Sequence, residues 1–154
     1  MSQQTKTFFL VSLVACLVGA ILTLFTNFAG FTGGYNENYY ATRYVHLALN
    51  NPVAPLVFLL IAVGFLYGAY VSLLGILGKE NSTGVTRGFL IQLFTFLIIV
   101  VGATIFMGAM WEGESYVKSW WFDIGFFGTV VMSVVTIFFF FKTKLIHFDI
   151  INKL

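Results

Sequence analysis

Four long apolar stretches divide the chain, and short polar segments separate them. They cover about residues 8–30, 53–77, 88–111 and 122–141, and no Asp, Glu, Lys or Arg lies near the centre of any of them. An α-helix needs about 20 apolar residues to cross the hydrocarbon core of a bilayer. The pattern therefore predicts one all-α integral membrane domain, residues 1–154, built as a bundle of four transmembrane helices.

The composition also indicates a membrane protein. Hydrophobic residues make up 59% of the 154 residues and charged residues only 9%, whereas soluble domains carry about 25% charged residues. A chain with so few charges cannot cover itself in water, so lipid must cover it. We expect a multi-pass protein of the plasma membrane, with the lipid bilayer and other membrane proteins as partners. The net charge of +2 is too small to indicate nucleic acid.

The basic residues predict the direction of the helices, because cytoplasmic loops carry an excess of Lys and Arg. Six basic residues fall in the N-terminus, in the loop between the second and third spans, or in the C-terminal tail, and two fall in the other loops. Both termini are thus expected in the cytoplasm, with two aromatic-rich loops, 31–52 and 112–121, outside. The tail, 142–154, either lies along the inner leaflet as an amphipathic helix or simply trails.

Small residues recur at every fourth position in three of the spans. Four residues advance a helix by about 400°, so residues at this spacing share one face, and close packing of small residues holds helices together in lipid. These faces either close a monomeric bundle or meet another protein. Asn27 and Gln92 are expected to hydrogen-bond between helices. The predicted helix-packing residues are Ala15, Gly19, Thr23, Asn27, Gly64, Gly68, Ser72, Gly125, Thr129 and Ser133.

The middle of each span carries no acidic, basic or histidine side chain, the groups expected at proton-transfer and ion sites. Ionisable residues deep in a bilayer mark such sites, and the spans lack them at mid-depth. A Ser/His/Asp or Cys/His set, a phosphate-binding loop and an HExxH motif are also missing from the sequence. No catalytic, cofactor-binding or metal-binding residue is therefore assigned, and the chain is predicted not to be an enzyme.

Polar and aromatic side chains gather in the two outer loops, as in an interfacial aromatic belt. Arg43 is expected to pair with Asp123, because an unpaired carboxylate is disfavoured at a partly dry boundary; the more exposed Glu112 and Glu114 are alternative partners. Residues 39–49 are expected to form a short interfacial helix. A divalent-ion site of His46 with the carboxylates is an alternative, although no spacing enforces it. The residues assigned to this outer cap, or to contact with a partner, are Arg43, His46, Glu112, Glu114, Trp120, Trp121 and Asp123.

The layout resembles that of claudin/PMP22-type four-span membrane proteins. Four spans, cytoplasmic ends and a larger first outer loop match that layout. "ATR" at 41–43 is similar to the end of the family's first outer loop, and "WWFDIGFFG" at 120–128 to the start of its fourth span. The first loop lacks the family's cysteine pair and tryptophan signature, and it is expected to be too short for the family's extracellular sheet. The resemblance implies adhesion, barrier or partner-chaperoning roles.

The function expected from the sequence is that of a non-enzymatic accessory or scaffolding subunit in a larger membrane assembly. It would act through its small-residue helix faces and its aromatic outer cap. Three alternatives remain open. They are a small channel or carrier lined by Ser, Thr and Asn, which would pass only a neutral solute; a claudin-like adhesion protein; and an enzyme working at the outer surface with His46 and the carboxylates.

Overall fold

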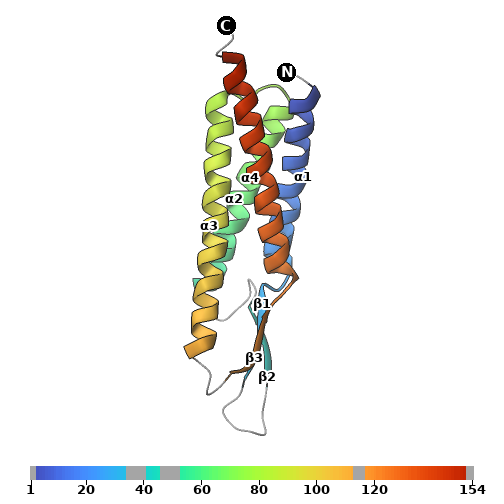
Figure 1. The fold of residues 1–154 in the computed structure, drawn as a ribbon. Coiled ribbons are helices and arrows are strands. Elements are labelled where there is room, and N and C mark those ends of the chain that lie inside the picture. Colours follow the sequence, from blue (N-terminus) through green and yellow to red (C-terminus); the bar gives the residue numbers. More distant parts are fainter. Residues whose placement is uncertain (1–2, 34–40, 46–52, 113–116, 152–154) are drawn as a thin grey trace.

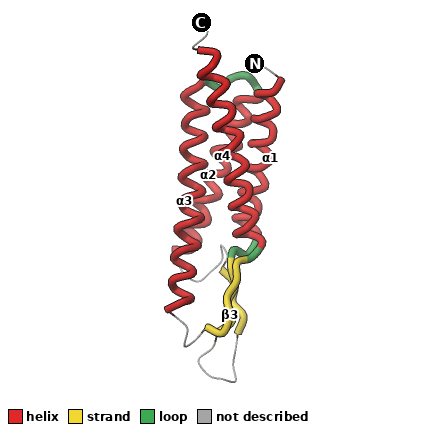
Figure 2. Tube along the Cα trace, in the orientation of Figure 1, coloured by secondary structure: helices red, strands yellow, loops and turns green. Residues whose placement is uncertain are grey.

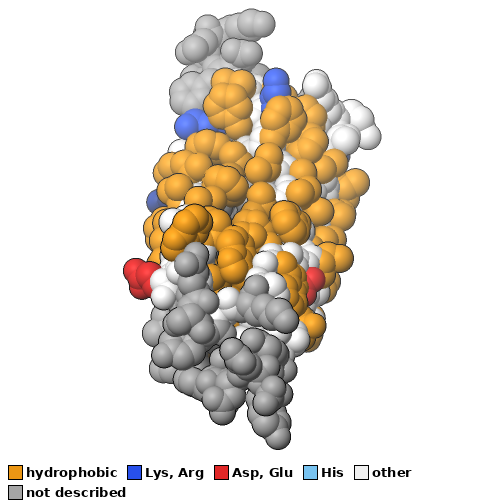
Figure 3. Space-filling model, turned by 60° about the horizontal axis from the view of Figure 1, so that its bottom comes forward, with side chains coloured by type: hydrophobic (Ala, Val, Ile, Leu, Met, Phe, Trp, Pro, Cys, Tyr) orange, Lys and Arg blue, Asp and Glu red, His pale blue; other side chains and the backbone are white. Residues whose placement is uncertain are grey.

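The computed structural model describes residues 3–33, 41–45, 53–112 and 117–151. Four long helices form an antiparallel bundle (Figure 1): α1 (Gln3–Phe25), α2 (Val53–Ile76), α3 (Ser82–Glu112) and α4 (Ile124–Ile151). Each is long and apolar enough to cross a membrane, and hydrophobic side chains cover most of the visible flank of the bundle (Figure 3). The prediction of a multi-pass, four-helix membrane protein is thus confirmed.

Each helix packs against its neighbours in the sequence, and α4 closes the ring against α1. The start of α1, the turn between α2 and α3, and the last turns of α4 lie together at one end of the bundle, here called the inner end (Figure 1). The opposite end, which carries the strands, is called the outer end. Lys6, Lys79 and Arg87 belong to inner-end segments. The assignment of the inner end to the cytoplasm stays a prediction.

A three-stranded antiparallel sheet, which the sequence analysis did not predict, projects from the outer end (Figure 2). Strand β1 (Ala29–Gly33) lies between β2 (Ala41–Val45) and β3 (Val117–Phe122). The two strands from the first loop have five residues each. Because the third strand comes from the second outer loop, the first loop has to supply only one hairpin.

The helix ends differ from the predicted limits of the spans. α1 stops at Phe25 rather than at residue 30, because residues 29–33 extend into β1, and residues 41–45, expected to be helical, form β2. α3 starts at Ser82 rather than at 88, because the Asn81 side chain accepts a hydrogen bond from the Gly84 N–H at 2.8 Å and caps the helix. α4 continues to Ile151, so part of the predicted tail is a continuation of the fourth span.

The turn between α2 and α3 is closed by a glycine in the left-handed region. Gly78 has φ +70°, a conformation that glycine adopts without a side-chain clash. The Lys79 N–H donates to the Leu74 carbonyl at 2.9 Å, and the Gly78 N–H donates to the Gly75 carbonyl at 3.1 Å. This is the hydrogen-bond pattern of a Schellman C-cap, and it ends α2 where a continued helix would leave the bundle.

Phenylalanine rings lying over glycines hold the helices close together. Each ring is at most 1% exposed and belongs to a helix that neighbours the one carrying its glycine. A β-carbon added at these glycines would come within 2.5–2.9 Å of the ring. Each glycine therefore makes room for an aromatic side chain that fills the space between two helices. The three pairs are Phe65 over Gly19, Phe9 over Gly75, and Phe140 over Gly88.

Candidate functional site

The small-residue faces predicted from the sequence lie inside the single chain. Buried between its helices are Ala15, Gly19, Thr23, Gly64, Gly68, Ser72, Gly125, Thr129 and Ser133. Asn27 is half-buried and lies beyond the end of α1, where its backbone carbonyl accepts a hydrogen bond from the Gly125 N–H at 3.0 Å. A side chain at Gly125 would collide with that backbone. The bundle itself thus occupies these faces, which leaves other surfaces for a partner.

Gln92 links three helices in the middle of the bundle. Its Nε2 donates to the Gly64 carbonyl of α2 at 2.7 Å, and the Thr136 hydroxyl of α4 donates to its Oε1 at 3.2 Å. Gly68 lies directly against this amide, so a side chain there would displace it. The expectation of an interhelical hydrogen bond is confirmed for Gln92, whereas Asn27 contributes its backbone and lies outside the helix.

The buried hydroxyls mostly bond to their own helices. Thr23 donates to the Gly19 carbonyl at 2.7 Å, Thr95 to Ile91 at 2.8 Å, and Thr129 to Gly125 at 2.7 Å. Each bond closes a side chain onto the preceding turn of its helix. These groups are therefore used for packing, and their arrangement offers little support for a polar path through this chain.

The outer sheet presents two different faces, because successive side chains of a strand point in opposite directions. On one face, the Trp121 indole lies over Gly30, and its ring centroid is 6.2 Å from that of Tyr44. On the other face lie the two register rows Ala29–Val45–Phe122 and Phe31–Arg43–Trp120. The first of these rows lies next to the helices and closes the outer end of the bundle.

The expected pairing of Arg43 with Asp123 is wrong. Arg43 is exposed on β2, and β1 separates that strand from β3, which Asp123 follows. The Asp123 carboxylate instead accepts the N–H of Ile124 at 2.8 Å, and its backbone carbonyl accepts the N–H of Phe126 at 3.0 Å. A carboxylate at a helix N-terminus is stabilised by the exposed N–H groups and the helix dipole, so Asp123 is satisfied without Arg43.

The remaining residues of the predicted outer cap do not form one cluster in the described structure. His46 and Glu114 lie outside the described residues. Glu112 is exposed at the end of α3, and Trp120 is 38% exposed on the sheet. Within the described ranges, no group of three or more His, Cys, Asp and Glu side chains is placed to hold a metal ion.

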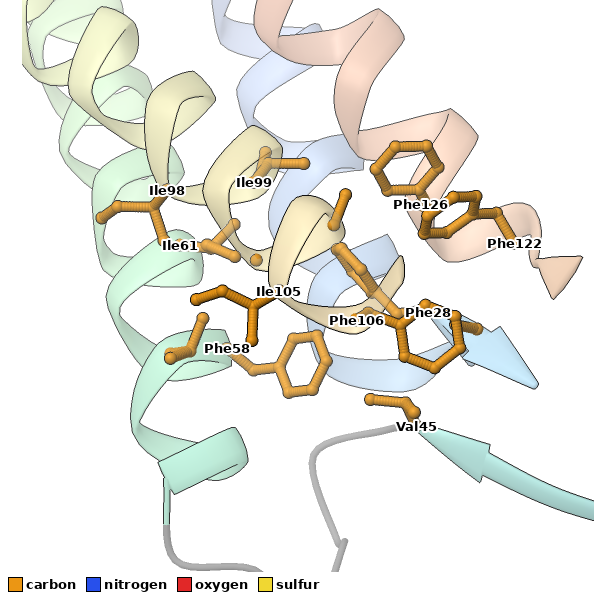
Figure 4. A pocket seen from close by; sticks show the side chains of 14 residues that line it. Phe28, Val45, Phe58, Ile61, Ile98, Ile99, Ile105, Phe106, Phe122 and Phe126 are labelled. Carbon is orange, nitrogen blue, oxygen red and sulfur yellow. The ribbon is translucent and has the colours of Figure 1, made fainter. Parts of the chain in front are cut away.

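An apolar cavity of about 310 Å³ lies between the outer halves of the helices and the sheet (Figure 4). Its walls come from α2, α3 and the start of α4, and the register row Ala29–Val45–Phe122 forms its outer end. None of the fourteen lining residues has a polar side chain. Ligand pockets are typically about 300–1,000 Å³, so this cavity is large enough for part of a small apolar molecule.

Aromatic rings form one side of this cavity. Phe122 stacks on Phe126 with a centroid distance of 4.2 Å, and Phe106 of α3 lies 5.6 Å from Phe122. Phe28 packs edge-on against Phe58 at 4.7 Å. Sequence reasoning missed these residues because it searched the outer loops for charged groups. The available signal was the concentration of Phe on both sides of the predicted outer boundary.

A scan against protein-family models finds no match to this chain, and a search of curated protein sequences finds none either.

Proposed function

We propose that this chain is a non-enzymatic accessory or scaffolding subunit of a larger membrane assembly, and that it contacts its partner through the outer half of α3. The observation that carries the proposal is how little of this helix the bundle covers. In the most apolar 18-residue window of α3, only 17% of the residues are buried. The corresponding shares are 39% for α1, 50% for α2 and 28% for α4. The helix is also 31 residues long, well beyond the roughly 20 that a bilayer requires.

The uncovered surface of α3 is suited to helix contact. We define the outer α3 face as Val101, Thr104 and Gly108, which are all exposed. Thr104 and Gly108 stand four residues apart, and an added β-carbon at Gly108 meets nothing within 4 Å. A pair of small residues at this spacing lets another helix approach closely. The other faces with this spacing are already occupied within the bundle.

Site-specific photocrosslinking tests this proposal. A photoreactive amino acid replaces Thr104 in one variant and Ile21 in another; Ile21 is 56% exposed on α1 and serves as the lipid-facing control. After irradiation in native membranes and gentle detergent extraction, mass spectrometry identifies the crosslinked proteins. We expect one stoichiometric membrane protein at Thr104 and only scattered products at Ile21. Equal yields at both positions would contradict an interface on α3.

The outer α3 face is tested separately by Gly108→Leu. The added side chain would meet no other group of the described residues, so the fold should persist. The same side chain would prevent a partner helix from approaching closely. We expect the crosslinked or co-purified partner to be lost, while thermal unfolding of the isolated chain is unchanged. Val131→Leu on α4, at a position 52% exposed, is the matched control and should keep the partner.

A claudin-like adhesion protein is the second candidate, and the outer sheet favours it. The strands join both outer loops into one structure that projects beyond the helices (Figure 1). Its outermost strands, β2 and β3, are edges, and strand edges offer unpaired backbone groups to another molecule. Such an arrangement suits contact with a protein outside the membrane.

Charge reversal at the two ends of the molecule tests the adhesion candidate. Arg43→Glu changes the exposed edge strand β2, and Lys79→Glu changes an exposed residue at the inner end. Clustering of non-adherent cells that express the chain is measured for each. Adhesion predicts that Arg43→Glu reduces clustering and Lys79→Glu does not. No clustering by the unmodified chain would remove this candidate.

A further inference from the structure

We infer that the outer cavity holds a single acyl chain of a membrane lipid, which enters between α2 and α3. This site does not depend on the proposed partner role. The cavity belongs to one chain, and its walls are formed by residues that are far apart in the sequence (Figure 4).

The lining of the cavity selects a purely aliphatic occupant. Aliphatic side chains of α2 and α3 form one side, with Ile61 and Ile98 among them, and the rings of Phe28, Phe122 and Phe126 form the other. A polar group in this space would meet no side chain able to hydrogen-bond with it, and water needs two to four polar partners to be held in a cavity. Water and polar ligands are therefore disfavoured.

The small residues of α3 leave the space for this occupant. Gly102 and Ala103 line the cavity, and a β-carbon added at Gly102 meets nothing within 4 Å. This is the reverse of Gly75 and Gly88 in the inner half of the bundle, where a phenylalanine ring lies over each glycine. Among the described residues, no ring fills the space that Gly102 provides.

The position of the opening identifies the source of the occupant. Ile105 lines the cavity and is also 67% exposed, whereas Phe28 on the opposite side is 9% exposed. The cavity therefore opens beside Ile105, on the flank of a membrane-spanning helix. The groups that surround such a flank are lipid hydrocarbon chains. A flexible acyl chain can enter sideways while its headgroup remains at the level of the sheet.

Photolabelling in vesicles tests the site. The full chain is reconstituted in phosphatidylcholine vesicles that contain a phosphatidylcholine with a diazirine near the methyl end of one acyl chain, and labelled residues are mapped by mass spectrometry. We expect labelling at Phe28 and Phe126, which lie inside the cavity. Labelling confined to outward-facing positions such as Leu17 and Ile21 of α1, which are 43% and 56% exposed, would overturn the inference.

A matched pair of substitutions on α3 separates cavity filling from other effects. Gly102→Leu places a side chain in the cavity, and Gly108→Leu places the same side chain on the outer surface; both glycines are surrounded by open space. Labelling at Phe28 and Phe126 should fall to background in Gly102→Leu and persist in Gly108→Leu. Persistence in Gly102→Leu would overturn the inference. Ala103→Leu serves as a second filling variant if Gly102→Leu does not fold.

The same experiment distinguishes other occupants and the proposed partner role. Stronger labelling of Phe28 and Phe126 by a photoactivatable cholesterol, with loss of acyl-chain labelling, would overturn the acyl-chain assignment. A protein crosslinked inside the cavity would overturn it as well. Crosslinking of a partner at Thr104 is measured separately from lipid labelling at Phe28 and Phe126. Loss of the first result contradicts only the partner interface, and loss of the second contradicts only the acyl-chain site.

Discussion

The inner and outer halves of the bundle differ in how glycine is used. In the inner half, Gly75 and Gly88 each lie under a buried phenylalanine ring, and the helices are held close. In the outer half, Gly102 and Gly108 of α3 meet nothing within 4 Å, and a cavity of about 310 Å³ remains beside the first of them. The helices are thus closely packed where a group from a neighbouring segment lies over a glycine, and loosely packed beside Gly102, where none of the described residues does.

The largest effect is expected from removing a ring that fills the space between two helices. Phe65 is fully buried over Gly19, and Phe→Ala in a packed core costs about 3–5 kcal/mol. We expect the loss of stability in Phe65→Ala to lie in the lower part of this range, because the side chain stays in an apolar environment when the helices separate. Phe106→Ala, beside the cavity, should cost clearly less. Thermal unfolding in detergent compares them, and equal losses would show that the surroundings of the two rings are packed alike.

A smaller loss is expected from adding a side chain to a filled glycine site. Gly68 lies against the amide of Gln92 and the sulfur of Cys16, and overpacking a core typically costs about 1–3 kcal/mol. Gly68→Leu should therefore lower the unfolding temperature, whereas Gly102→Leu should leave it unchanged or raise it slightly. Comparable destabilisation by both substitutions would mean that the space beside Gly102 is not open in the folded protein.

The hydrogen bonds of Gln92 should contribute modestly to stability. Interhelical hydrogen bonds in membranes average about 0.6 kcal/mol, so Gln92→Leu, which loses two, should cost on the order of 1 kcal/mol. In a double-mutant cycle with Thr136→Val, the combined loss should be less than the sum, because both substitutions remove the same bond. Strict additivity in thermal unfolding would argue against the bond between Gln92 and Thr136.

The smallest effects are expected at the outer charges. Asp123→Asn removes a charge from the start of α4 and should cost about 0.3–1 kcal/mol at low salt, an effect that added salt should reduce. Arg43→Gln should leave stability unchanged, since Arg43 is exposed on β2. The two substitutions should be additive. If thermal unfolding shows that the two losses of stability are not additive, this result would support an ion pair between Arg43 and Asp123 and contradict the separation of the two residues by β1.

Much of the helical architecture could be predicted from the sequence, because lipid imposes a simple length and polarity requirement on each span. The helix-packing residues were predicted from their four-residue spacing. Spacing shows that Gly64 and Gly68 share one face of α2, but it does not show which residues of the other helices lie against that face. The structure places Gln92 there and a phenylalanine ring over Gly19. Val71 is 2% exposed, although its hydrophobicity would allow it to face lipid, since an apolar residue suits lipid and protein equally well.

The outer region was predicted poorly for a related physical reason. Arg43 and Asp123 are natural partners by charge, but a strand between them keeps them apart, and a helix N-terminus satisfies the carboxylate. The sheet pairs residues 29–33 with residues 117–122, and the strands are too short to give a strong local signal. Their pairing depends on the helices that bring the two loops to the same end.

The four membrane-spanning helices could be predicted from the amino-acid sequence alone, because the length and composition of each apolar stretch are local properties. The packing over each glycine, the position of the sheet and the cavity beside Gly102 became visible only in the folded chain. These features depend on which side chains meet from distant segments. In a chain whose helices are apolar on every side, hydrophobicity cannot choose the faces that meet, and the fit between large and small side chains makes that choice.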